Sequence, residues 1–177
     1  MHWTRGLNMR FIPSCIAVML AIIAGEARAQ NAPADPFNGT WRLNVAKSTS
    51  MWQAQPQPKI AVPQPQSHEL ITMRITDGTM QYRVEYGQGN DRNTAATYTA
   101  KFNDAKWQDI RGEIEGGLGA LTLVKINDRL HYWVTRTKDG QFGGLIHRRM
   151  ADDGKSFASI RLGTDGYVQY VRVFEKQ

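Results

Sequence analysis

The feature that most constrains the fold is a series of short alternating segments, separated by tight turns at roughly ten-residue intervals. In one of them, Met80, Tyr82 and Val84 alternate with polar residues. A period of two predicts strands with one buried face, and the Asp-Gly turns between segments suit hairpins. The expected strands are 37–44, 69–76, 80–86, 97–102, 107–110, 121–126, 130–137, 141–149, 157–162 and 167–174.

This pattern predicts an all-β fold, an antiparallel meander of about eight to ten strands. Closure removes exposed edges, which invite aggregation, so we expect a barrel whose interior holds side chains or one small ligand. A sandwich with a filled core is the alternative. Residues 53–66 contain four prolines and many glutamines, which predicts an extended polyproline-like loop after the first strand.

The first 29 residues have the three parts of an export signal. Arg5 and Arg10 precede an apolar run over 11–25, and an Ala-Arg-Ala motif ends at Ala29. The apolar run is shorter than the roughly 20 residues that span a bilayer. We therefore expect bacterial export, cleavage after Ala29, no stable membrane insertion, and a single periplasmic or secreted domain over 30–177.

Composition narrows the classes of function. The one cysteine, Cys15, lies in the expected signal, so the mature domain would have no disulfide and no thiolate chemistry. Without Arg5, Arg10, Arg28 and Glu26, the 22 basic and 16 acidic residues leave a net charge of +4. These charges are scattered and form no basic stripe, so we predict no nucleic-acid partner. The oligomeric state is open.

The two ends of the mature chain resemble a known family. Phe37-Asn-Gly-Thr-Trp-Arg-Leu43 resembles the opening of the calycin barrels, and 171–176 resembles the last strand of fatty-acid-binding proteins. With the following Asn-x-Ala-Lys-Ser, the opening is similar to secreted bacterial lipocalin-like proteins of largely uncharacterised function. The resemblance implies that Trp41 lies at the closed end of a barrel, with Arg172 across its ring, in a structural role.

Two histidines lie on consecutive expected strands joined by a Lys-Asp-Gly turn. A three-residue turn pairs Thr137 with Gln141 and so places His131 opposite His147 on one face. A two-residue turn places His147 opposite Tyr132 instead. Facing histidines could form a proton relay. Without a third ligand they are a weak metal site, so we predict no metal and no cofactor.

A cavity wall could form on the same face. The alternation places Trp133 and Arg149 beside the two histidines, where Arg149 could bind a ligand carboxylate and Trp133 could stack on an apolar group. The opposite face, with Tyr132, could equally point inward. Tyr82 and Tyr98 are further candidates to line a pocket, although core filling is the commoner role for such tyrosines.

Three hypotheses of function follow. The first is a barrel that binds a small, mostly apolar ligand, possibly an acidic one. The second is a cofactor-free isomerase, cyclase, dehydratase or lyase in which His131, His147 or Tyr82 moves a proton. The third is an interaction module that docks through residues 53–66.

Overall fold

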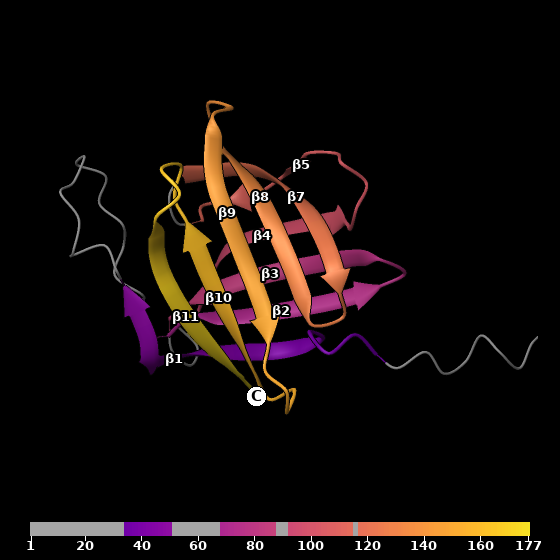
Figure 1. Ribbon diagram of the computed structural model, residues 1–177, viewed down its shortest axis with the longest axis vertical. Helices are drawn as coiled ribbons and strands as arrows, with labels where there is room; N and C mark the ends of the chain where they lie inside the picture. Colours follow the sequence, from indigo (N-terminus) through magenta and orange to yellow (C-terminus); the bar gives the residue numbers. More distant parts are fainter. Residues whose placement is uncertain (1–33, 51–67, 88–91, 115–116) are drawn as a thin grey trace, which may run out of the picture. The chain divides into compact units, whose positions relative to one another are not determined.

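The computed structural model describes residues 34–50, 68–87, 92–114 and 117–177. Within this part of the chain, eleven antiparallel strands form one sheet, in the order β5-β7-β8-β9-β10-β11-β1-β2-β3-β4-β6 (Figure 1). The expected all-β meander is confirmed. The strands are β1 (Gly39–Ser50), β2 (Leu70–Thr76), β3 (Thr79–Tyr86), β4 (Asn93–Lys101), β5 (Gln108–Asp109), β6 (Arg111–Gly112), β7 (Leu118–Asn127), β8 (Leu130–Thr137), β9 (Phe142–Met150), β10 (Ser156–Leu162) and β11 (Val168–Lys176).

The first and last long strands pair with each other, which curls the sheet into a nearly closed barrel. In the β1–β11 register, Trp41 lies opposite Lys176. The outermost strands, β5 on β7 and β6 on β4, are only two residues long, and Ile110 alone separates them in the chain. Because the sheet's two edges are joined by this short segment, little strand edge remains exposed.

The inward side chains follow the alternation of the sequence. In β3, Met80, Tyr82 and Val84 are buried, whereas Gln81 and Arg83 are exposed. The same pattern in the other long strands produces one continuous core inside the barrel. The hydrophobic effect therefore fixes which face of each strand points inward.

Aromatic rings fill one end of the barrel. Their residues lie at or next to the strand ends on the same side, before β1, after β4 and near the starts of β8 and β10. The ring centroid of Phe37 lies 4.3 Å from that of His131 and 5.6 Å from that of Phe157. The Trp41 indole nitrogen donates to the Phe37 carbonyl oxygen at 2.9 Å. We call this cluster the closed end: Phe37, Trp41, Phe102, His131 and Phe157.

A β-bulge in β9 determines which residues of β8 and β9 share a face. Next to the turn, Arg136 lies opposite Phe142, as a three-residue turn requires. One step further, Thr135 lies opposite Gly144, so Gly143 is an extra residue on β9. Such a bulge moves the register by one position for the rest of the hairpin.

The bulge corrects the expected pairing of the two histidines. Beyond Gly143, His147 lies opposite Tyr132 and Arg148 lies opposite His131. The alternative in which His131 faces His147 across the hairpin is therefore wrong, and His147 faces Tyr132 as in the other alternative, although the turn has three residues. The turn has the length that the first alternative assumed, but the extra residue turns His131 and His147 to opposite faces of the sheet.

Two predicted segments lie outside the described residues. These are the expected export signal, residues 1–29, and the Pro/Gln-rich loop, residues 53–66. The interaction hypothesis for that loop stays a prediction for the same reason. In the part of the chain that is described, no helix has the length and apolar character needed to cross a membrane.

Candidate functional site

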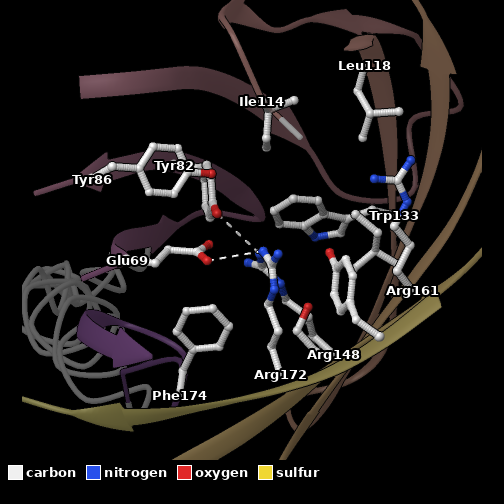
Figure 2. A pocket seen from close by; sticks show the side chains of 13 residues that line it. Glu69, Tyr82, Tyr86, Ile114, Leu118, Trp133, Arg148, Arg161, Arg172 and Phe174 are labelled. Atoms are coloured by element: carbon white, nitrogen blue, oxygen red, sulfur yellow. Dashed lines mark hydrogen bonds and ion pairs between the residues drawn. The ribbon is translucent and has the colours of Figure 1, made fainter. Parts of the chain in front are cut away.

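A small cavity of about 20 Å³ lies inside the barrel (Figure 2). This is space for about one water molecule. The three arginines in its lining are each less than a tenth exposed. The lining combines apolar side chains with guanidinium groups, among them Ile114, Leu118, Ile146, Arg148, Arg161 and Arg172.

The described lining of the cavity carries a formal charge of +2, from three arginines and the single carboxylate of Glu69. Glu69 Oε2 accepts a hydrogen bond from Arg172 Nη1 at 3.1 Å, and both side chains are more than nine-tenths buried. One of the dashed lines in Figure 2, from the Glu69 carboxylate, marks this ion pair. Buried charge is costly unless an opposite charge offsets it, and here the Glu69 carboxylate offsets the charge of Arg172.

Arg148 reaches across the interior from β9. Its Nη1 lies 3.3 Å from the Met73 sulfur on β2, and its Nη2 donates to the Tyr82 hydroxyl on β3 at 3.3 Å. Its guanidinium carbon lies 3.6 Å from the centre of the Trp133 ring on β8. Within the described residues, no carboxylate forms an ion pair with Arg148, and its Nε has no hydrogen-bond partner.

The Arg148 guanidinium lies near the rings of Tyr82 and Trp133, and the Tyr98 ring packs against both. We call these three aromatic side chains the ring layer: Tyr82, Tyr98 and Trp133. The two tyrosine rings stack with centroids 4.8 Å apart. The Trp133 ring meets both edge-on, at 5.0 Å and 5.2 Å. Offset and edge-to-face contacts of this kind stabilise aromatic pairs by about 0.5–1.5 kcal/mol each.

Burial keeps both phenols of the ring layer neutral. It raises the pKa of Tyr82 to about 12, although the positive charge of Arg148 acts in the opposite direction. Burial also raises the pKa of Tyr98 well above its usual value. Neither phenol is a ready base at neutral pH, and the Tyr82 oxygen serves as a hydrogen-bond acceptor for Arg148.

The structure brings together some of the expected site residues. Tyr82 and Trp133 line the cavity, and Tyr98 packs against both. The sequence analysis missed Arg148 and Arg161 as inward residues. Two adjacent arginines on a strand must point to opposite faces, so the pair at 148–149 already required one inward arginine if the strand was placed in the barrel wall.

His131 lies inside the barrel but in the closed end. It is fully buried between the rings of Phe37 and Phe102, and neither of its ring nitrogens has a hydrogen-bond partner in the described residues. Burial lowers the pKa of His131 to about 4. The negative charge of Asp35 raises this pKa and the positive charge of Lys125 lowers it, so these two smaller effects oppose each other. His131 is therefore a neutral core residue and does not line the cavity.

His147 and Arg149 lie on the outer face of β9. The His147 ring stacks on the Tyr132 ring at 4.9 Å, and partial burial followed by the charge of Arg149 lowers the His147 pKa. The expectation that His131, Trp133, His147 and Arg149 share one face is wrong, because of the bulge. Among the three candidate acid–base residues, only Tyr82 lines the cavity. Among described residues, no group of three potential metal ligands lies together.

The cation beside Trp41 is Lys176, and the expectation of Arg172 is wrong. The Lys176 ammonium lies 5.2 Å from the centre of the Trp41 ring, because these residues are opposite each other in the β1–β11 register. Arg172, four positions earlier on the same face, reaches the cavity and lies over the Tyr170 ring at 4.3 Å. Trp41 itself is fully buried in the closed end.

No family model and no curated protein matches the chain. Among solved structures, it is similar to the Schistosoma mansoni fatty acid binding protein in complex with arachidonic acid (TM-score 0.56, 12% identity, 82% of this chain and 99% of that chain). It is also similar to a mutant of the fluorescent protein UnaG (0.51, 15%, 80% and 96%) and to the REP1-NXSQ fatty acid transporter (0.52, 13%, 79% and 95%). The chain thus has the fold of the fatty-acid-binding-protein-like calycin barrels.

Proposed function

We propose that this protein binds a small, mostly apolar molecule with an acidic group inside its barrel. The observation that carries the proposal is Arg148, a guanidinium that is 3% exposed and has no carboxylate partner among the described residues. Arginine binds carboxylates through two parallel hydrogen bonds. An acidic ligand would supply the negative charge that no described carboxylate provides to Arg148. Ile146 and Leu118 would contact the apolar part of the ligand.

A further observation supports an acidic ligand. Two of the solved structures with this fold are described as a fatty acid binding protein with arachidonic acid and as a fatty acid transporter. We infer that this chain uses its interior in the same general way, with the acid next to the guanidinium groups.

Ligand binding would require side chains of the cavity to move, because about 20 Å³ does not hold an organic acid. Arg161 is a long, unbranched side chain. Its apolar stem would cover the apolar part of the ligand while its charged group approaches the acid.

Native mass spectrometry of the protein, purified from the organism that makes it, tests this proposal. We expect a small molecule at near-unit stoichiometry, and after denaturation its mass and fragmentation should identify a carboxylic or other acid. A co-purified ligand that is a cation or carries no acid group would contradict the proposal. If the protein is recovered empty, titration with naphthoate and decanoate replaces this readout, and failure to bind either acid would contradict it equally.

We also propose that the domain functions outside the cytoplasm, after cleavage behind Ala29. The basis is the sequence of residues 1–29, with its basic start, apolar run and Ala-Arg-Ala motif. N-terminal sequencing of the protein from the periplasm or the medium tests this. A sequence that begins at Gln30 is expected, and an uncleaved N-terminus in the cytoplasm would contradict it.

A further inference from the structure

The interior of the barrel has two halves with different chemistry, separated by the ring layer. On one side lies the closed end, made of rings. On the other side lies the cavity, with the guanidinium groups of Arg161 and Arg172 in its lining (Figure 2). The Arg148 guanidinium stands at the boundary, 3.6 Å from the Trp133 ring of the ring layer and 5.5 Å from the Phe157 ring of the closed end.

Among the described residues, packed rings fill the closed end. The rings of Trp41 and Phe157 meet edge-on with centroids 5.0 Å apart, and those of Phe102 and His131 lie 4.6 Å apart. None of the five residues of the closed end lines the cavity. Interiors packed in this way lose many contacts when a ring is displaced, so a ligand cannot easily open them.

The other half can change its shape at lower cost. This half holds the cavity of about 20 Å³, so its packing is less complete than that of the closed end. Tyr86, which lines the cavity, is only half-buried. Rotation of such side chains toward a ligand enlarges the cavity without opening the packed rings.

We propose that the ring layer is the floor of the binding site and restricts the ligand to compact acids, such as those with one or two rings or a short chain. This inference rests on the proposed function and adds the size of the ligand. The acid group would meet Arg148 at the floor, and the remainder of the ligand would lie on the cavity side of the ring layer. Long-chain fatty acids would gain nothing from their additional length, because the closed end is filled.

A series of acids tests this limit by isothermal titration calorimetry: naphthoate, hexanoate, decanoate and palmitate. In a cavity that continues into the closed end, each further buried methylene would tighten binding about fourfold. We expect naphthoate to bind at least as tightly as decanoate. We expect the affinity for palmitate to lie within about threefold of that for decanoate. The extra methylenes of palmitate could not enter the closed end, so they would bury little further apolar surface.

The outcomes separate the inference from the proposed function. If affinity continues to rise by more than threefold from decanoate to palmitate, or if naphthoate binds more weakly than decanoate, acid binding stands and the size limit is overturned. If none of the four acids binds, both fail. If the acids bind and the affinity levels off before palmitate, with naphthoate among the tightest, both are supported.

Phe37→Ala provides a second measurement. It removes a ring from the closed end, below the ring layer and away from the cavity lining. If the ring layer is the floor, the ligand cannot reach the space that the Phe37 ring leaves in the closed end. The affinity for palmitate should then change less than twofold. A tenfold or larger gain would show that the chain reaches the closed end and would overturn the inference. If this variant does not fold, the acid series on the unmodified protein decides alone.

Discussion

The guanidinium of Arg148 lies 3.6 Å above the ring of Trp133, and both side chains are almost fully buried. A cation over an indole ring gains about 2 kcal/mol when it is shielded from water. The ring supplies no formal negative charge, however, so it does not neutralise Arg148. This contact therefore holds the arginine in place and leaves its charge available to an anion.

Replacing Arg148 should not weaken the fold of the ligand-free protein. Met is unbranched and carries no charge, and even the replacement of a complete buried ion pair by apolar residues is often neutral or stabilising by about 1–4 kcal/mol. We expect Arg148→Met to unfold in urea at the same or a higher midpoint. The matched control is Arg149→Met, one residue further on the outer face. A loss of more than about 1 kcal/mol in Arg148→Met alone would contradict this view.

The ion pair between Glu69 and Arg172 should behave in the opposite way. Glu69→Gln leaves the Arg172 guanidinium buried without its carboxylate, and breaking a buried pair in this way costs about 3–5 kcal/mol. The double variant Glu69→Gln, Arg172→Met removes both charges and should recover most of that loss. Thermal and urea unfolding of the three proteins measure the effect, and additive losses would count against a coupled pair.

His131 should make the fold sensitive to mild acid. Because burial holds its pKa at about 4 in the folded state, below the ordinary 6.5, the unfolded chain takes up a proton that the folded barrel does not. Stability should therefore fall as the pH drops from about 6.5 to 4, by about 3 kcal/mol in total.

Urea unfolding at several pH values measures this dependence. The groups that act on His131 are Asp35, Lys125, Asp128 and Arg148, and burial outweighs them. His131→Phe should lose this part of the slope, whereas His147→Gln on the outer face should retain most of it. An unchanged slope in His131→Phe would show that other groups cause the acid sensitivity.

The bulge in β9 should depend on Gly144. Its φ of +110° is strained for other residues, and a Cβ would lie 2.4 Å from the Leu162 carbonyl oxygen. Gly144→Ala should cost about 3 kcal/mol or more, through strain and the clash. Gly140→Ala is the control, since its φ is +84° but nothing lies within 4 Å of the added Cβ. That change should cost only about 1 kcal/mol, and equal losses would contradict the role of the clash.

The barrel was predictable because its signals are local. Alternation of buried and exposed residues fixes a strand within a few positions, and the expected strand 121–126 lies within β7 (Leu118–Asn127). The Asp-Gly turns mark the hairpins in the same local way. The pairing of the first and last strands followed from the general cost of exposed edges together with the resemblance of the two ends.

The site was not predictable to the same degree because it depends on register. A glycine at position 143 is compatible with a β-bulge, but only the pairing with the facing strand, β8, determines whether Gly143 is the unpaired residue of a bulge. That one residue sends Arg148 inward and His147 and Arg149 outward. The cation on Trp41 is a similar case, since the sequence alone offers two cations on one face of the last strand.

The most direct test of an anion site at Arg148 is calorimetric titration of naphthoate into the unmodified protein, Arg148→Met and Arg149→Met. A hydrogen-bonded contact with a charged group contributes about 1.5–3 kcal/mol, so Arg148→Met should bind about 10- to 150-fold more weakly. Arg149→Met should bind as the unmodified protein does. Equal affinity in all three proteins, with Arg148→Met fully folded, would contradict the account.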